Sequence, residues 1–348
     1  MTKKQRVIAT IKGEETDYLP FHSDMTSVVR EKLAEYYKIG IKDVYNKIDN
    51  HITYCSYKTF AYHKVLENKI KLDKELSIDE FGILWDSKSQ KNIGDWGMVD
   101  HPVRNFDFSN YVWPNGEEPG RFDDIEQQVM HDTDNFITLG LSGLFDTAWH
   151  LTGIEDMLMA MADSDTSVIN YVLDHSLNFL VGVIRQIPKG AIDSVRFVED
   201  WGSQHGLIMG IQNWRKYLKP RLKELYAEVH EKGLFVHSHS CGDNSELYGD
   251  LIEIKVNISD PLQPEVMDIG KVKERFGHDI TFMGGLPCQS IIPMGSPNEV
   301  YDITKKTYEV LAKGGHYILG GAGAFSTETP VDNIIAIVNF YNEIKQSV

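Results

Sequence analysis

The second half of the chain repeats one local pattern, in which a helical stretch ends in glycine and a short β-rich run follows at once. The pattern occurs four times, at "KGAIDSVRFVED", "KGLFVHSHSCGD", "FGHDITFMGGLPC" and "GGHYILGGAGAF", and a fifth strand-like run, "IEIKVNISDP", lies between the second and third. Glycine is the usual residue after the last helical turn, and the β-branched and aromatic run behind it is typical of a buried strand. Strands and helices in this alternation predict parallel strands joined by crossover helices.

The helices between these runs are recognisable by the period of their apolar residues. Residues 213–233 carry one apolar stripe, and Pro220 predicts a kink in the first turns of that helix. The stripe consists of Trp214, Tyr217, Leu218, Leu222, Leu225, Tyr226 and Val229. Residues 297–312 and 330–345 show the same period. The second half is therefore expected to alternate strand and helix throughout.

Parallel strands of this kind form either an open doubly wound sheet or a closed barrel. We favour the barrel, because no GxGxxG follows the first strand and the unusual residues stand at the carboxyl ends of several strands. The predicted fold class is α/β, a (β/α)8 TIM barrel with N-terminal helical additions. We expect a single domain over 1–348, with the barrel core and the metal site in 131–348.

The first 130 residues show the barrel pattern less clearly. They contain helical patterns near 3–12, 26–38 and 41–49, followed by the loop-rich "EFGILWDSKSQKNIGDWGMVDHPV". We expect residues 1–130 to supply the first barrel strand, "YLPFHSD", and a cap over the barrel mouth.

Charge and cysteine content restrict the compartment and the partners. The chain has a formal net charge of -16, which argues against a nucleic-acid partner. No 18-residue apolar span or signal peptide is recognisable, so neither a membrane nor secretion is expected. Its three cysteines are too few and too scattered for a disulfide framework in 348 residues. We therefore expect a cytoplasmic protein whose thiols are available as ligands.

The run "GLFVHSHSCGD" places His237, His239 and Cys241 at alternate positions of one short strand. Alternate residues of a strand project from the same face, so the three side chains share one side of the sheet. The pattern also fits a packed histidine pair beside a buried thiol. The decision between these readings depends on whether other strands send ligands to the same place.

Two further side chains stand at neighbouring strand ends. Glu199 ends "SVRFVED" and Cys288 follows "ITFMGGLP", so a barrel is expected to bring Glu199, His239, Cys241 and Cys288 to one rim. Zinc is the metal that this set of imidazole, thiolate and carboxylate favours. A helix cap or structural salt bridge is the alternative role for Glu199, and an ordinary buried thiol is the alternative for Cys288. His237 lies one pleat deeper and is expected to orient a ligand.

The central and closing segments resemble the uroporphyrinogen decarboxylase superfamily and, within it, the corrinoid-dependent methyltransferases. The resemblance is carried by residues 198–266, beginning "VEDWGSQHGLIMG", and by the closing "GGHYILGGAGAFSTETPVDNIIAIVNFY". It implies a TIM barrel. In the first 130 residues it is limited to patterns such as "ETDYLPF" and "DEFGILWD". The arginine-rich motif with which the decarboxylases bind porphyrin carboxylates is missing from "LPFHSDMTSVV", so a porphyrin is a poor candidate substrate.

Among the methyltransferases, the resemblance points to a subgroup. Thiol methyltransferases of the coenzyme M type share the HxC pair but take a third ligand from a GCG motif, which here reads "GAG" with Ala322 in the middle. With Cys288 and Glu199 as ligands, the chain looks more like the zinc-dependent aryl methyl ether:corrinoid protein methyltransferases of O-demethylases. That resemblance implies a cobalamin on a separate corrinoid protein, because the chain has no DxHxxG signature of its own.

The expected reaction moves a methyl group from a small aromatic methyl ether to Co(I), and proton donors can assist the leaving oxygen. His237, His22 and Asp24 are the catalytic candidates by position. Trp201, Gln204 and Phe21 are the candidates for binding the ring. A thiol methyltransferase, a metal-free decarboxylase-like lyase and a non-catalytic binding barrel are the competing functions, and a homodimer remains open.

Overall fold

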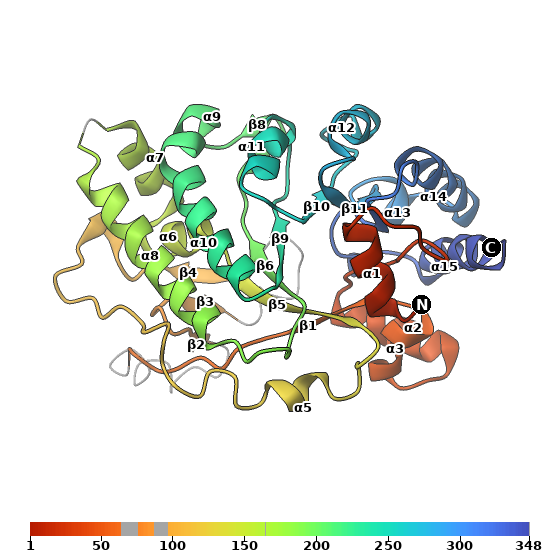
Figure 1. Ribbon diagram of the computed structural model, residues 1–348, viewed down its shortest axis with the longest axis horizontal. Coiled ribbons are helices and arrows are strands. Elements are labelled where there is room, and N and C mark those ends of the chain that lie inside the picture. The colour runs from red at the N-terminus through yellow and green to blue at the C-terminus, as the bar shows by residue number, and fades with distance from the viewer. Residues whose placement is uncertain (64–75, 87–96, 164, 348) are drawn as a thin grey trace.

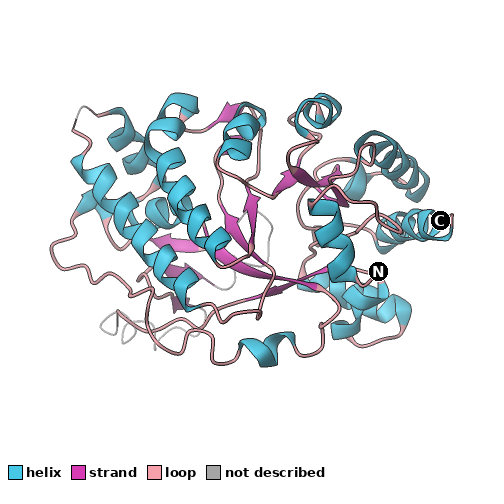
Figure 2. Ribbon diagram, viewed as in Figure 1, coloured by secondary structure: helices cyan, strands magenta, loops and turns pink. Residues whose placement is uncertain are grey.

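The structure is a computed structural model that describes residues 1–63, 76–86, 97–163 and 165–347. Its centre is a parallel sheet in the order β1-β5-β6-β9-β10-β11-β12, which Figure 2 shows in magenta with helices around it. The strands are β1 Ile52–Cys55, β5 Phe136–Ser142, β6 Ser194–Val198, β9 Phe235–His239, β10 Ile258–Leu262, β11 Thr281–Leu286 and β12 Tyr317–Gly321. All five runs predicted in the second half are strands of this sheet.

The segment "YLPFHSD" closes the sheet into a barrel. Phe21 forms a parallel bridge with Leu319 of β12, and Met25 forms another with Phe325. On its other side the Phe21 carbonyl accepts a hydrogen bond of 2.9 Å from the backbone N–H of His51, directly before β1. This segment thus takes the place of the eighth strand between β12 and β1, and it is the first barrel strand in chain order, as the sequence predicted. Because the N-terminal part supplies barrel strands, we propose that the chain forms one domain.

Helices surround the strands. Figure 1 shows α8 and α10 side by side on one flank and α12, α14 and α15 on the opposite flank, with both termini on that second side. The helices are α1 Lys3–Ile11, α2 Ser27–Tyr37, α3 Val44–Lys47, α5 Ile125–Val129, α6 Leu144–Thr152, α7 Ile154–Ala162, α8 Ser167–Gln186, α9 Gly210–Asn213, α10 Lys219–Glu231, α11 Tyr248–Glu253, α12 Ile269–Phe276, α13 Ile291–Met294, α14 Pro297–Leu311 and α15 Val331–Gln346. A π-helical turn, Trp214–Leu218, precedes α10 where Pro220 predicted an irregularity.

The amino-terminal end of the barrel is filled with apolar side chains. One buried cluster combines Val7 and Ile11 of α1 with inward-facing residues of the strands. These strand residues are Ile52, Phe136, Ile258, Met283 and Ile318. Helix α1 also contacts β5 and β12, so it covers this end of the barrel. The polar side chains described below therefore lie in the other half of the interior.

The segment predicted as loop-rich contains a small antiparallel sheet. Its strands are β2 Leu76–Ile78, β3 Leu84–Asp86 and β4 Met98–Asp100, while residues 87–96 lie outside the described part of the chain. Strands of three residues are too short to show a period in the sequence. The turn between β2 and β3 is built by Asp79, whose Oδ1 accepts hydrogen bonds from the N–H groups of Phe81 and Ile83. After β6 comes a hairpin of two strands with two residues each, β7 Gly202–Ser203 and β8 Gly206–Leu207.

One helix corrects an expectation about apolar spans. By length and composition alone, α8 could cross a membrane, since its 20 residues include a window of mean hydropathy 1.3. In this structure 61% of that window is buried, and α8 packs against α6 and α10. Its apolar residues are therefore those of a helix that packs in the core.

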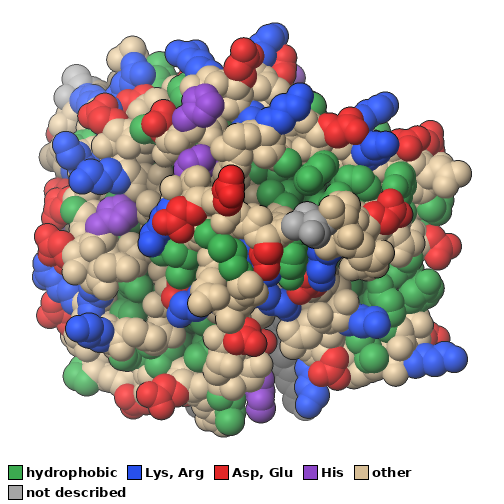
Figure 3. Space-filling model, turned by 45° about the vertical axis from the view of Figure 1, so that its right-hand side comes forward, with side chains coloured by type: hydrophobic (Ala, Val, Ile, Leu, Met, Phe, Trp, Pro, Cys, Tyr) green, Lys and Arg blue, Asp and Glu red, His purple; other side chains and the backbone are tan. Residues whose placement is uncertain are grey.

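On the face in Figure 3, hydrophobic side chains gather in patches between interspersed acidic and basic ones.

Candidate metal centre and active site

Three side chains with metal-binding atoms meet at the carboxyl end of the barrel. Ligand atoms of Asp200, His239 and Cys241 all lie within 4.8 Å of one another. His239 Nε2 and Cys241 Sγ are 3.6 Å apart, and the backbone N–H of Cys241 donates to Asp200 Oδ1 at 3.1 Å. The structure therefore brings together His239 and Cys241 of the predicted set, with Asp200 in the place predicted for Glu199.

The register of two strands explains why the aspartate joins the group. Val198 of β6 pairs with His239 of β9, so the next residues of the same parity on the two strands are Asp200 and Cys241. Successive residues of a strand project from opposite faces. Glu199 consequently projects to the outside of the barrel, while Asp200 projects toward its mouth. This alternation was a signal in "SVRFVED" that could have identified Asp200.

The Glu199 carboxylate is occupied by the start of α6. Its oxygens accept hydrogen bonds from the N–H groups of Leu144 (2.6 Å), Phe145 (2.9 Å) and Asp146 (3.4 Å). A Cβ at Gly143, the N-cap of α6, would overlap this carboxyl group, so glycine is required there. Burial and the neighbouring Asp146 raise the pKa of Glu199 well above its usual range. This arrangement is the helix cap that the sequence left as the alternative role for Glu199.

Cys288 lies after β11, outside the three-residue group. Its thiol is 3.5 Å from the Gly323 carbonyl, to which it donates, and a Cβ on Gly321 would press against its sulfur. Burial, followed by Glu265, raises the pKa of the Cys288 thiol to about 12. The Cys288 thiol is therefore protonated near neutral pH, and its side chain is partly buried. Cys55 is also buried and free of disulfide bonds.

A buried carboxylate anchors the imidazole from behind. Asp260 of β10 pairs with His239 in the strand register, and its Oδ2 lies 2.9 Å from His239 Nδ1. Its other oxygen, Oδ1, is 2.8 Å from Nε2 of the fully buried His237. His237 therefore contacts the ligand histidine through Asp260, which agrees with an orienting role, and burial lowers the pKa of His237.

Arg196 neutralises this carboxylate. Its Nη2 donates to Asp260 Oδ2 at 2.8 Å and lies 2.7 Å from His239 Nδ1. Because His239 Nδ1 carries a proton that it donates to Asp260, it cannot accept a hydrogen bond from Arg196. Arg196 therefore stabilises the Asp260 carboxylate through their ion pair. Burial opposes ionisation of Asp260, but Arg196 and the two histidines hold its pKa well below the usual range. Burial likewise lowers the pKa of His239, and the Asp260 carboxylate more than offsets this, raising it to about 10.

The donor set fits zinc by chemistry and by spacing. Two ligands of a tetrahedral zinc, at bond lengths of about 2.0 Å for nitrogen and 2.3 Å for sulfur, are about 3.5 Å apart. The separation of 3.6 Å between Nε2 and Sγ matches this value. A ligand histidine usually donates its other N–H to a carboxylate, as His239 does to Asp260. Three protein ligands leave one position for a substrate or water, which is typical of catalytic zinc sites.

His22 and Asp24 lie in the same half of the barrel, in contact with each other. His22 Nε2 is 3.2 Å from Asp24 Oδ1, and the His22 ring packs edge-on against Tyr54 at 5.3 Å between centroids. The Arg196 guanidinium lies over the same Tyr54 ring, 5.1 Å from its centre. Burial raises the pKa of Asp24, but the hydrogen bond with His22 and the charges of His22 and Arg196 together outweigh it, and the net effect is a lowered pKa. These two candidates therefore face the charged interior.

The three residues predicted to bind the substrate lie elsewhere. Trp201 is fully buried and packs against Trp214 with 5.4 Å between ring centroids. Phe21 is also fully buried and stacks on Tyr341 of α15 at 4.9 Å, on the outer side of the barrel. Gln204 is exposed in the turn between β7 and β8. None of the three lines a cavity described below.

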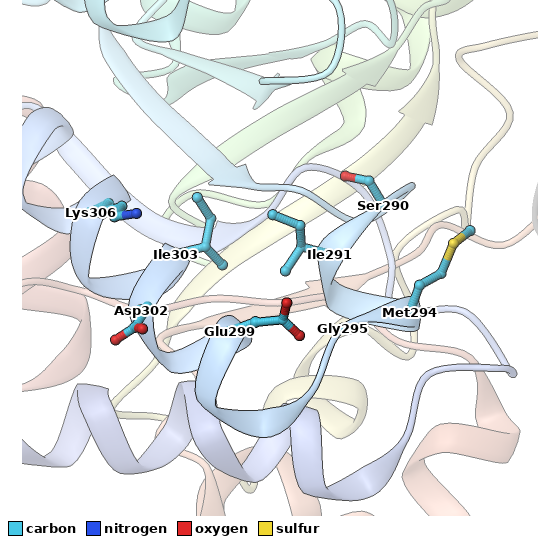
Figure 4. A pocket seen from close by; sticks show the side chains of 8 residues that line it. All are labelled: Ser290, Ile291, Met294, Gly295, Glu299, Asp302, Ile303 and Lys306. Atoms are coloured by element: carbon cyan, nitrogen blue, oxygen red, sulfur yellow. The ribbon is translucent and has the colours of Figure 1, made fainter.

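A cavity of about 310 Å³ lies beside the metal-ligand group. It is lined by the strand ends Ser142 and Val198, by α6, and by the segment that carries β2 and β3. A second hollow of about 470 Å³ lies between α13 and α14, where Ile291 and Ile303 face each other across it (Figure 4). Asp146, which lines the first cavity, accepts a hydrogen bond from the backbone N–H of Asp200, whereas, among the described residues, the lining of the second hollow makes no such contact with the metal-ligand group. The first cavity is therefore the candidate substrate site.

Asp260 and Arg196 are buried charged residues in contact with His239 that the sequence analysis missed. Arg196 precedes Val198 by two positions, and Asp260 follows Ile258 by two, so both share the inward parity of His239. Two charged residues at inward positions of otherwise apolar strands could have indicated a buried ion pair.

Comparisons with known proteins agree with the fold and with the motifs. A methylated-thiol–coenzyme M methyltransferase of Methanosarcina mazei is 24% identical to this chain over 355 residues, covering 99% of the chain and 90% of that protein. A solved structure of a methyltransferase from Methanosarcina mazei matches 99% of both chains with a TM-score of 0.71 and 17% identity, a likeness that shows the fold. The model of the uroporphyrinogen decarboxylase (URO-D) family matches residues 137–344. Because this match spans more than half of the chain, the protein belongs to the uroporphyrinogen decarboxylase family.

Proposed function

We propose that the protein is a zinc-containing methyltransferase that moves the methyl group of a methoxylated aromatic compound to the Co(I) corrinoid of a partner protein. The observation that carries the proposal is the meeting of Asp200, His239 and Cys241 at the barrel mouth, anchored from behind by Asp260. The methyltransferases among its relatives support methyl transfer as the reaction class. Three free cysteines fit work in the reducing cytoplasm.

The residues of this chain would bind and orient. His239 Nε2, Cys241 Sγ and the Asp200 carboxylate would hold the zinc, which supplies Lewis-acid stabilisation for the negative charge that develops on the ether oxygen. Asp260 fixes the His239 ring, and Asp200 also holds the backbone of Cys241 in place. His22, paired with Asp24, is the proton donor proposed for the leaving oxygen, whereas the fully buried His237 acts on His239 through Asp260. The corrinoid partner would approach through the barrel mouth, since α1 fills the opposite end.

A thiol methyltransferase is the second candidate, and the name of the related methylated-thiol–coenzyme M methyltransferase favours it. Ala322 argues against it, because the thiol methyltransferases carry a cysteine ligand at the middle of this triplet. The two candidates share the metal and differ in the substrate.

The deciding experiment mixes the purified protein with a reduced corrinoid protein and a panel of methoxybenzenes, methylthiols and methylamines. We expect the corrinoid spectrum to change from Co(I) to methyl-Co(III) only with methoxybenzenes, with release of the matching phenol. His239→Ala should abolish turnover. Turnover of methylthiols alone would favour the second candidate, and a protein purified without chelators that contains no zinc would revive the decarboxylase-like alternative.

A further inference from the structure

The cavity beside the metal-ligand group has aromatic walls that the family pattern "DEFGILWD" builds. Asp79 shapes the turn through its bonds to Phe81 and Ile83, and its Oδ2 accepts a hydrogen bond of 2.9 Å from Trp85 Nε1. Trp85 is thereby held with its edge against His150 at 5.6 Å between centroids. Phe81 packs edge-on against Phe179 at 4.7 Å. These two rings are fixed by neighbours on several sides, so the cavity is preformed.

The floor of the cavity belongs to α6 and connects it with the metal-ligand group. Asp146 lines the cavity, and its Oδ1 accepts a hydrogen bond of 3.2 Å from the backbone N–H of Asp200. Next to it, the buried Thr147 hydroxyl lines the same cavity and has no hydrogen-bond partner among the residues the structure describes. A buried hydroxyl without a partner costs free energy, so this hydroxyl is available to a ligand.

The charges of the lining exclude an anion. Asp79, Glu80 and Asp146 line the cavity, and no lysine or arginine is among its described lining residues. Glu80 is already paired with Arg121, whose Nη2 donates to it at 2.9 Å from behind the wall. A carboxylate or sulfonate placed here would lose its hydration without gaining a cation. Neutral aromatic groups, by contrast, pack well against Phe81, Trp85 and Tyr57.

The size fits one substituted ring. An apolar cavity of about 150 Å³ is large enough to bind benzene, and this cavity measures about 310 Å³. It can therefore accept a benzene ring with a methoxy group and one further small substituent.

We infer that this cavity binds the ring of a neutral methoxybenzene that carries a hydroxyl group, with Trp85 and Phe81 against the ring and Thr147 bonded to the hydroxyl. The inference rests on the proposed function and narrows its substrate class to neutral methoxyphenols. Methoxybenzoates and coenzyme M, which are anions, are excluded.

Binding can be measured without turnover. Titration calorimetry of the intact protein with 2-methoxyphenol should give a 1:1 complex, whereas 2-methoxybenzoate and coenzyme M should bind at least tenfold more weakly. Trp85→Ala should weaken 2-methoxyphenol binding by about tenfold or more. Trp113→Ala is the matched control, because Trp113 packs against Phe108 and His175 outside the cavity. Equal affinity in wild type and Trp85→Ala would overturn the inference.

Thr147→Val provides a second test that keeps the side-chain shape. Because the variant loses one hydrogen bond to the ligand, 2-methoxyphenol should bind several-fold more weakly. Methoxybenzene, which lacks the hydroxyl, should bind unchanged. Loss for both ligands alike, or for neither, would overturn the role of Thr147. If methoxybenzenes are demethylated with a KM that Trp85→Ala leaves unchanged, the proposed function stands and this cavity does not bind the ring. If 2-methoxyphenol binds in a Trp85-dependent way but no methyl transfer occurs, the cavity stands and the proposed function fails.

Discussion

Asp260 and His239 stand opposite each other on neighbouring parallel strands, with the Asp260 Oδ2 oxygen 2.9 Å from His239 Nδ1. This pairing leaves Nε2 as the nitrogen that faces Cys241 and the barrel mouth. The strand register therefore sets the direction of the His239 ring and the nitrogen that faces Cys241, before any metal binds. A site of this kind needs little rearrangement to bind zinc.

Asp260→Asn should consequently reduce zinc affinity by about 10–100-fold, the usual cost of removing a carboxylate behind a ligand histidine. Competition with a chromophoric chelator measures it. Asp268→Asn is the control, since Asp268 caps α12 and pairs with Lys271 on the surface. Unchanged affinity in Asp260→Asn would remove the anchoring role of this carboxylate.

The three-residue metal group predicts a contrast between cysteines. Wild type should contain about one zinc per chain, Cys241→Ala should lose it, and Cys288→Ala and Cys55→Ala should retain it. The reason is that only the Cys241 sulfur lies with His239 and Asp200. Metal analysis of the four proteins decides the matter. Loss of zinc from Cys288→Ala would instead support the four-ligand set that the sequence predicted.

Trp201→Ala separates a packing role from a substrate-binding role. Trp201 is fully buried against Trp214, so its removal should cost about 3–5 kcal/mol in the free energy of unfolding. Denaturant unfolding measures this cost, and the KM for the methoxybenzene should stay as in wild type at temperatures where the variant is folded. A raised KM with unchanged stability would restore Trp201 to the substrate site.

His51 should make the fold sensitive to acid. Burial lowers its pKa to about 3, and its ring lies between Arg6 Nη1 at 3.0 Å and the Asp49 carbonyl at 2.7 Å. Because the unfolded chain binds this proton near the ordinary pKa of about 6.5, His51 makes stability fall as the pH drops from about 6.5 toward 3, by up to about 1.4 kcal/mol per pH unit.

Replacing His51 with glutamine should flatten this dependence, measured as the free energy of unfolding between pH 7 and the acid transition, roughly the window set by the two pKa values. His205→Gln, at an exposed position, should leave the dependence as in wild type. The same acid sensitivity in both variants would show that His51 is not the titrating group.

The barrel was predictable because four of the five strands of the second half follow a helix and a glycine at or shortly after its end. Gly233, with φ of 74°, adopts the left-handed conformation that such an ending requires. The three-residue strands β2, β3 and β4 were not predictable, since their order depends on the bonds of Asp79 and on pairing with each other. Local pattern therefore identified the long elements and missed those that tertiary contacts stabilise.

One physical rule accounts for the differences at the site. Residues on a strand and at its end alternate between the barrel interior and the surrounding helices. Glu199, Trp201 and Phe21 have the outward parity, and the structure places each of them against a helix or in the core. Asp200 and His22 have the inward parity. The sequence analysis chose some of these residues by chemical type rather than by parity.

The apolar plug formed by Val7 and Ile11 of α1 has a consequence for the order of events. A barrel closed at one end is entered from the other, so under the proposed function a small methyl donor and a large protein bearing cobalt would use the same opening. A substrate ring bound in the cavity beside Trp85 would leave the barrel axis open for the protein partner. Under the proposed function the donor would then enter first, and the phenol product would leave only after the protein partner has withdrawn.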